Sequence, residues 1–267
     1  MNKYIIDTHT HLYDEAFEQD CDEVLMSSLE AGIRYFLLPN CDQSTYLQMQ
    51  NLCKKYPNVC FPMYGVHPTS LTKDNWQYEL ARVKEALVND SRPIAIGEIG
   101  IDLYWSKEAV EEQQLTFRQQ LQWALDYNLP VSVHCRKGFA QIIEVLDEFK
   151  GKSLTGVFHC FSEGEAQLNK VLDYGFYVGL GGVVTFKKAH IADLLPTIPE
   201  DRFVLETDAP YLAPTPKRGQ RNLPEYLHYV AQFIADKTGR TKEDIIHKST
   251  ENALRLFQID SFIGFRP

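Results

Sequence analysis

Short apolar segments alternate with amphipathic segments along the whole chain. Between the apolar segments, apolar residues recur at spacings of three and four, which predicts helices in segments such as 20–31, 77–88, 108–127 and 140–149. Glycine and proline residues lie where these helices should end. The apolar segments have the length of buried strands, and there are eight of them: 4–7, 34–38, 60–66, 93–99, 130–134, 154–161, 176–184 and 202–207.

Eight strands that each precede a helix, in a chain of 267 residues, predict an α/β fold of the (β/α)₈ or TIM barrel type. A doubly wound open sheet is the alternative, because periodicity alone does not show that a sheet closes. Two further helices are predicted at 225–237 and 242–257, and we expect the second to be an addition that buries one flank. We expect one barrel domain over residues 1–260 and a short C-terminal tail at 261–267.

The composition agrees with one large core, since 44% of the residues are hydrophobic. The chain has no apolar run of about eighteen residues, and its start lacks the pattern of a secretory signal. We therefore expect a cytoplasmic protein with no membrane contact. We also expect reduced thiols, because no Cys-x-x-Cys pair occurs among Cys21, Cys41, Cys53, Cys60, Cys135 and Cys160.

The charge balance restricts the ways in which the chain could bind nucleic acid. With 27 basic and 36 acidic residues, the formal net charge is −9. This charge argues against a broad basic surface for duplex nucleic acid. A polyanionic substrate would have to be held locally, by metal ions and a few basic side chains.

Two histidines, His9 and His11, lie one residue apart at the end of the first predicted strand. Side chains two residues apart in a strand point to the same face, so the pair can direct two imidazoles at one metal ion. Polar residues at a strand end can also simply face solvent. The pair alone therefore does not establish a metal site.

Further metal-binding side chains lie at the predicted ends of other strands. In a TIM barrel these ends meet at the face that carries the active site. Taken singly, each histidine could be a buried side chain bonded to a backbone carbonyl. Together they would be costly to bury without a cation, so we predict a metal centre formed by His9, His11, His67, Glu98, His134, His159 and Asp208.

The alternation of side chains along a strand suggests roles for three neighbours of these residues. Glu206 has the same parity as Asp208 and would lie one layer deeper, where it could orient a metal ligand. Cys135 and Cys160 each follow a histidine directly and should point outward, toward the helices. We expect both cysteines to be packing residues.

Several ordered motifs together resemble the TatD family of metal-dependent deoxyribonucleases, a branch of the amidohydrolase-like TIM barrels. The segments that carry the resemblance are Asp-Thr-His-Thr-His-Leu at 7–12, Gly-Val-His-Pro at 65–68, Gly-Glu-Ile-Gly-Ile-Asp at 97–102, Val-His-Cys-Arg at 133–136, Phe-His-Cys-Phe-Ser at 158–162, Thr-Phe-Lys at 185–187 and Glu-Thr-Asp-Ala-Pro-Tyr-Leu at 206–212.

The resemblance implies a site for two divalent metal ions. His9 and His11 would bind one ion together with Asp208, Glu98 would bridge, and His134 and His159 would bind the second. Residues 94–102 contain no lysine, so we do not expect a bridging carboxylated lysine. The ligand types do not decide between Mg²⁺, Mn²⁺ and Zn²⁺.

The activity that the resemblance implies is hydrolysis of phosphodiester bonds in DNA, or in RNA, by 3′-5′ exonuclease action on single strands or ends. Water activated by two metals would be the nucleophile. Asp208 is our candidate to orient or deprotonate this water, and Glu98 to bridge the ions. His67 would contact the scissile phosphate or the leaving group, with a purely structural histidine as the alternative. We expect no obligate protein partner.

Basic and aromatic residues after the predicted strands could contact the nucleic acid. Arg136, Lys187 and Arg221 are candidates for phosphate binding, with weaker cases for Lys137, Lys188, Lys217 and Arg218. The bases could stack on Tyr104, Trp105 and Phe161, which would favour single strands. Solvated loops and ordinary packing are the alternatives for these residues.

Two other functions use the same residues. A metal-dependent hydrolase of a carbonyl bond, such as an amidase, an esterase or an aminoacyl-tRNA deacylase, could use the same activated water. A binding protein with a structural metal is the weaker alternative, because structural sites are usually closed and rich in cysteine.

Overall fold

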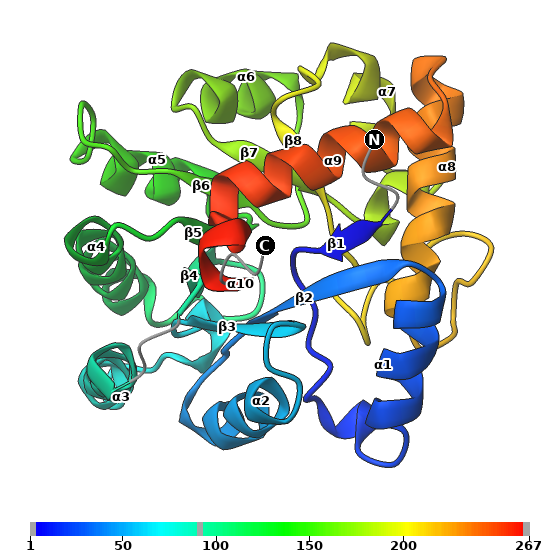
Figure 1. The fold of residues 1–267 in the computed structure, drawn as a ribbon. Coiled ribbons are helices and arrows are strands. Elements are labelled where there is room, and N and C mark those ends of the chain that lie inside the picture. Colours follow the sequence, from blue (N-terminus) through cyan, green and yellow to red (C-terminus); the bar gives the residue numbers. More distant parts are fainter. Residues whose placement is uncertain (1–3, 90–92, 264–267) are drawn as a thin grey trace.

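The computed structural model describes residues 4–89 and 93–263. Its strands form one parallel eight-stranded sheet in chain order, with helices around the outside (Figure 1). This arrangement confirms the predicted (β/α)₈ barrel. The strands are β1 (Ile5–Asp7), β2 (Ile33–Pro39), β3 (Cys60–Tyr64), β4 (Ala95–Asp102), β5 (Val131–Arg136), β6 (Gly156–Phe158), β7 (Tyr177–Leu180) and β8 (Phe203–Leu205).

Hydrogen bonds between the ends of β1 and β8 bring the two edges of the sheet together. The Thr8 amide donates to the Leu205 carbonyl at 3.1 Å, and the Asp208 amide donates to the His9 carbonyl at 2.8 Å. The buried carboxylate of Asp7 accepts from the Thr207 amide at 2.9 Å and from its hydroxyl at 2.5 Å. The alternative of an open sheet is therefore wrong.

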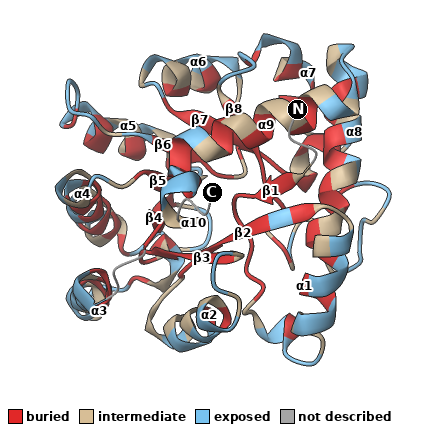
Figure 2. Ribbon diagram, viewed as in Figure 1, coloured by how far each residue is buried: buried red, intermediate tan, exposed pale blue. Residues whose placement is uncertain are grey.

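The helices bury one face against the sheet and expose the other to solvent (Figure 2). Their apolar residues at spacings of three and four pack on the strands, as the sequence predicted. The helices are α1 (Cys21–Glu30), α2 (Gln43–Lys55), α3 (Trp76–Asn89), α4 (Val110–Tyr127), α5 (Phe139–Asp147), α6 (Glu165–Asp173), α7 (Ile191–Leu194), α8 (Leu227–Thr238), α9 (Lys242–Phe257) and α10 (Ile259–Ile263).

Several strand boundaries differ from the prediction. The predicted strands 154–161 and 176–184 are longer than β6 and β7, because apolar residues beyond these strands are buried although they lie outside the regular strands. After β7 the chain forms a short 3₁₀ helix, Gly182–Thr185. The predicted strand 93–99 ends too early, since β4 continues to Asp102. Glu98 therefore lies inside a strand rather than at its end.

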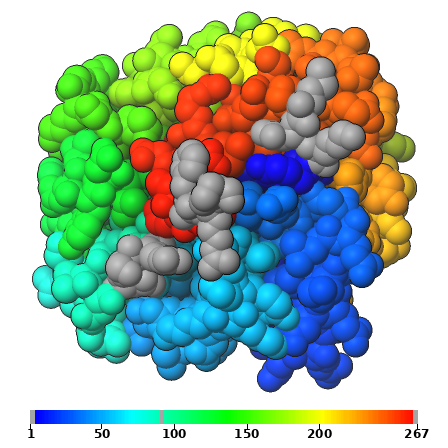
Figure 3. Space-filling model, viewed as in Figure 1, coloured from blue at the N-terminus to red at the C-terminus, as the bar shows by residue number. Residues whose placement is uncertain are grey.

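Helix α9 closes the amino-terminal end of the barrel rather than one flank. Asn252 donates to the carbonyls of Glu200 and Phe203 at 2.9 and 2.8 Å, just before and at the start of β8. Leu256 and Phe257 pack in the same cluster as the interior residues of the strands. Figures 1 and 3 show α9 lying across this face. The open face of the barrel is the other one, where the strands end.

We predicted that the barrel domain ends at residue 260 and that a tail follows. This boundary falls inside the short helix α10. Residues 261–263 of the expected tail belong to this helix, and the remainder, 264–267, lies outside the described residues. No helix in the described part of the chain is long and apolar enough to cross a membrane. All six cysteines are free thiols, as expected.

Candidate metal centre

The predicted metal ligands meet at the carboxyl ends of the strands, where all of them except the buried His9 line one cavity. The cavity has a volume of about 330 Å³. It is lined by His11, Cys41, His67, Thr69, Ser70, Glu98, Asp102, Trp105, His134, Arg136, His159, Asp208 and Tyr211. These residues come from segments far apart in the sequence, and the barrel brings them to one face.

Glu98 on β4 lies at the centre of the cluster and is only 3% exposed. Its Oε2 atom lies 3.1 Å from Nε2 of His9. Its Oε1 atom lies 2.8 Å from Nδ1 of His134 and 3.4 Å from Nε2 of His159. Because its two oxygens face different imidazoles, Glu98 has the arrangement of a carboxylate that can bridge two cations.

Asp208, three residues beyond β8, faces the first histidine pair. Its Oδ1 atom lies 3.2 Å from Nε2 of His11 and 3.7 Å from Nε2 of His9. We expected His9 and His11 to lie at the end of the first strand, but β1 ends at Asp7. The alternation of side chains along a strand therefore does not explain why the two rings face the same point. The imidazoles converge because the backbone beyond β1 bonds to the segment that carries Asp208, where the His11 amide donates to Ala209.

The imidazoles of the cluster each have one ring nitrogen held by a second residue. A hydrogen bond at one nitrogen fixes the ring and the tautomer, and leaves the other nitrogen for a metal. These pairs are His9 with the Ser132 hydroxyl at 3.1 Å, His11 with the Tyr13 hydroxyl at 2.8 Å and His134 with Asp102 at 3.0 Å. His159 has an ion-pair contact instead, with Nδ1 3.0 Å from Oε1 of Glu206.

Glu206 lies one layer deeper than the cluster, as its position in the strand predicted. Gly179 on β7 leaves space for its side chain. A Cβ atom at Gly179 would lie 2.2 Å from Oε2 of Glu206, so any larger residue at this position would displace the carboxylate. Oε1 of Glu206 also accepts a hydrogen bond from the Cys160 amide. A hydrogen bond from the Cys160 amide and an ion-pair contact with His159 thus hold the Glu206 carboxylate in place.

Our sequence analysis missed three of the supporting residues: Tyr13, Ser132 and Asp102. Ser132 precedes His134 by two residues on β5, and Asp102 follows Glu98 by four residues on β4. An even spacing in a strand places side chains on the same face, so parity with a predicted ligand was the available signal. We applied this test to Glu206, Cys135 and Cys160, but not to Ser132 or Asp102.

His67 differs from the other imidazoles in its hydrogen bonds. The Thr69 amide donates to Nδ1 of His67 at 3.2 Å, so Nδ1 is an acceptor and the neutral ring carries its proton on Nε2. Nε2 lies 3.2 Å from Nδ1 of His134 and 3.4 Å from Oε1 of Glu98. Burial lowers the pKa of His67, which favours this neutral form. The ring therefore presents an N–H donor to the cavity.

The charges in the cluster favour a cation. Burial alone would raise the pKa of Glu98, but the imidazoles of His67, His159 and His9 hold that pKa well below its ordinary value. Burial would likewise lower the pKa of His159, but the carboxylates of Glu206 and Glu98 raise it to about 10. Carboxylates that stabilise a protonated imidazole here would also stabilise a divalent cation.

The contact between His134 and Glu98 tests the fit of a metal directly. Asp102 accepts the proton of His134 Nε2, so the neutral ring has a lone pair at Nδ1. This lone pair lies 2.8 Å from the carboxylate oxygen of Glu98. Two acceptors at this distance repel each other unless a proton or a cation lies between them. The donor set and its geometry therefore fit a divalent metal ion.

Among the described residues, three groups have ligand atoms that all lie within 4.8 Å of one another. They are His9, His11 and Glu98; His9, His159 and Asp208; and His67, Glu98 and His134. The structure thus brings together the six ligands that the family resemblance implied, with His67 beside them. His159 lies next to both parts of the cluster, because its ligand atom groups with those of His9 and Asp208 and lies 3.4 Å from the Glu98 oxygen that faces His134.

The residues that we predicted to contact the substrate differ in their position relative to the cavity. Arg136 and Trp105 line the cavity, whereas Lys187 is exposed and lies outside its lining. Arg221 forms an ion pair with Asp20 at 2.5 Å and donates to the Ala16 carbonyl, so its guanidinium is held away from the cluster. Phe161 is only 3% exposed and belongs to the core, so it has no free face for a base.

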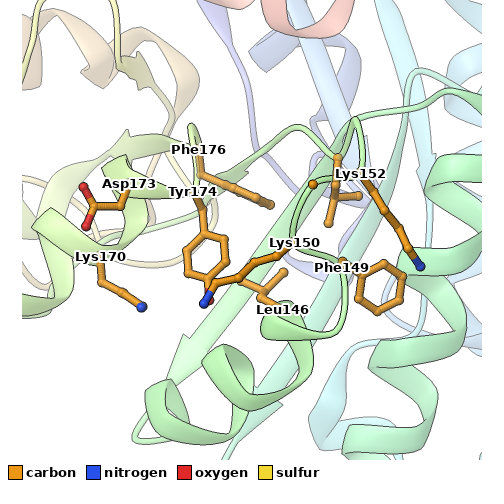
Figure 4. A pocket seen from close by; sticks show the side chains of 10 residues that line it. Leu146, Phe149, Lys150, Lys152, Lys170, Asp173, Tyr174 and Phe176 are labelled. Carbon is orange, nitrogen blue, oxygen red and sulfur yellow. The ribbon is translucent and has the colours of Figure 1, made fainter.

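A second cavity, of about 340 Å³, lies at the opposite end of the barrel, before β6 and β7 (Figure 4). Its walls include Phe149 and Phe176, and its rim carries Lys150, Lys152 and Lys170. Lys150 is paired with Asp147 at 2.7 Å. This cavity contains none of the described metal-binding groups, so the candidate chemistry is confined to the carboxyl-terminal face.

Comparison with known proteins places the chain in a family. The profile of the TatD related DNase family matches residues 6–258. A metal-dependent hydrolase of Bacillus subtilis, YabD, is 34% identical over 257 residues, which are 96% of this chain and 100% of YabD. The 3′-5′ ssDNA/RNA exonuclease TatD of Pectobacterium parmentieri is 31% identical over 261 residues, which are 96% of this chain and 100% of that protein.

The fold agrees with these relatives. The crystal structure of YJJV, a TatD homologue from Escherichia coli, superposes with a TM-score of 0.89 at 27% identity, over 97% of this chain and 99% of YJJV. The motifs, the barrel and the histidine and carboxylate cluster lead to the same result. This chain belongs to the family of TatD related DNases.

Proposed function

We propose that the protein removes nucleotides from the 3′ end of single-stranded DNA or RNA by metal-dependent hydrolysis of phosphodiester bonds. The observation that carries the proposal is the position of Glu98, whose two oxygens face different imidazoles in one accessible cavity. The relative from Pectobacterium parmentieri, a 3′-5′ ssDNA/RNA exonuclease, supports the substrate and the polarity.

The cluster would hold two divalent ions. His9, His11 and Asp208 would bind the first, His134 and His159 the second, and Glu98 both. When bound, such ions lower the pKa of a water molecule and offset the charge on the attacking and leaving oxygens. Mg²⁺, Mn²⁺ and Zn²⁺ are the candidates, with Mn²⁺ and Zn²⁺ favoured by the number of imidazoles.

Two side chains have further roles toward the substrate. Asp208 lines the cavity and has a carboxylate that can orient the attacking water or accept its proton. The Nε2–H group of His67 can donate to a phosphate oxygen or to the leaving oxygen. Because the proton sits on Nε2, we assign His67 to the substrate rather than to a metal, although its ligand atom lies close to those of Glu98 and His134.

Of the three basic residues that we predicted to bind phosphate, only one lies in the cavity lining. Arg136 lines the cavity and can grip a phosphate oxygen. Lys187 can contact the nucleic acid only outside the cavity lining. Arg221 is left out, because its pairing with Asp20 occupies the guanidinium. A cytoplasmic location and independence from a protein partner complete the proposal.

The test uses single-stranded DNA and RNA labelled at the 5′ end, with protein stripped of metal and then reloaded with Mg²⁺, Mn²⁺ or Zn²⁺. We expect products shortened one nucleotide at a time from the 3′ end, and no reaction with chelator or with Glu98→Gln. Intact oligonucleotides under every metal would refute the proposal. Faster cleavage of ester or aminoacyl-tRNA substrates would favour a carbonyl hydrolase instead.

A further inference from the structure

The segment directly after β4 carries two exposed aromatic side chains beside the metal cluster. Trp105 is 68% exposed and Tyr104 is 43% exposed. Their rings pack edge to face, with centroids 4.7 Å apart and planes at 89°. Trp105 also lines the cavity that contains Glu98, His134 and Asp208. A large indole is therefore open to solvent at the edge of the candidate active site.

Buried polar residues hold this aromatic segment in place. Oδ1 of Asp102 accepts the amides of Tyr104 and Trp105 at 2.8 and 2.7 Å. The buried Gln113 on α4 donates to the carbonyls of Ser106 at 2.8 Å and Asp102 at 3.2 Å. The backbone of the segment is thus fixed at both ends of its turn, so binding a base on Trp105 need not order it.

A basic side chain completes the same edge. The guanidinium carbon of Arg136 lies 4.2 Å from the ring centroid of Tyr104 and 5.5 Å from that of Trp105. Tyr104 thereby supports Arg136 through a cation–π contact, and Arg136 reaches the cavity lining. An aromatic face next to a positive charge is the pattern that binds an unpaired base and its phosphate.

Asp102 connects this edge to the chemistry. Its Oδ2 atom accepts from Nε2 of His134, while its Oδ1 atom holds Tyr104 and Trp105. The buried carboxylate of Asp102 on β4 therefore fixes the position of Tyr104 and Trp105 relative to His134. A base placed on Trp105 would lie at the edge of the cavity that Glu98 and His134 line.

We infer that Trp105, supported by Tyr104 and Arg136, is a stacking platform for an unpaired base next to the scissile phosphate. This inference rests on the proposed function and names the part of the substrate that the site recognises. It explains how a chain with a net charge of −9 could select single strands, since a paired base has no free face to stack. Recognition would depend on the presence of a base and little on its identity.

The test measures binding without turnover. Fluorescence anisotropy gives the dissociation constants of two labelled single strands with phosphorothioate linkages at the 3′ end, one natural and one abasic at its last two positions. Wild type should bind the natural strand about tenfold more tightly, or by about 1.4 kcal/mol. Trp105→Ala should bind both strands equally, and Trp105→Phe should keep part of the preference.

The control is Tyr78→Ala, which removes an exposed aromatic side chain on α3, and it should keep the wild-type preference. An undiminished tenfold preference in Trp105→Ala would overturn the platform, as would wild-type protein that binds both strands equally. Cleavage of an unmodified strand separates the two proposals. A Trp105-dependent preference without cleavage would support the platform and refute the nuclease.

Discussion

Asp102 lies 3.0 Å from Nε2 of His134, and through this bond a buried carboxylate fixes which ring nitrogen faces Glu98. Asp102→Asn can present an N–H group to the ring and would disturb the tautomer. We expect the affinity for metal to fall by about 10- to 100-fold, with the barrel intact. Metal titration followed by calorimetry measures this change. Asp126→Asn, on the outer helix α4, is the control and should bind metal like wild type.

His67 should matter for turnover and not for metal content. In His67→Ala the donor to the phosphate or leaving group is lost, so we expect kcat to fall by about 10²- to 10⁴-fold. Mass spectrometry for metals should give the wild-type number of ions per chain. Loss of one ion would instead make His67 a ligand, together with Glu98 and His134.

Gly179 should be sensitive to the smallest substitution. In Gly179→Ala the new methyl group would collide with the Glu206 carboxylate and displace it from His159. We expect metal affinity to fall by about tenfold or more. Gly164→Ala is the matched control, because its nearest neighbour is the flexible end of Gln167. Equal metal binding by the two variants would show that Glu206 does not orient His159.

Helix α9 should contribute to stability through Asn252. In Asn252→Ala two buried carbonyls, of Glu200 and Phe203, lose their donor. We expect the free energy of unfolding to fall by about 1 to 3 kcal/mol. Urea denaturation measures the change, and Gln232→Ala, on the exposed face of α8, should remain within about 0.5 kcal/mol of wild type. Equal stability of both variants would contradict a role for α9 in closing the barrel.

The fold was predictable because hydrophobic spacing records which face of each element is buried. The bounds of α9 agree with the prediction at both ends, since Thr241 caps its first turn and Gln258 ends it in a left-handed conformation. The ends of β6 and β7 were not predictable in this way. Apolar residues such as Phe161 and Val184 are buried beyond the strands, and burial does not distinguish pairing from packing.

The positions of the metal-binding side chains followed from their motifs, whereas those of the basic residues did not. The motifs place these histidines and carboxylates at or near strand ends, and a barrel brings such ends to one face. An arginine in a loop can pair with any nearby acid, and Arg221 pairs with Asp20, about two hundred positions away in the sequence. Such long-range pairs leave no local pattern, so only the structure could remove Arg221 from the site.

The most direct test of the central claim is anomalous diffraction from crystals loaded with Mn²⁺. The proposed centre predicts two peaks, about 3.5 to 4 Å apart, with one oxygen of Glu98 facing each. His9, His11 and Asp208 should surround one peak, and His134 and His159 the other. A single peak, or two peaks that do not share Glu98, would contradict the two-metal centre.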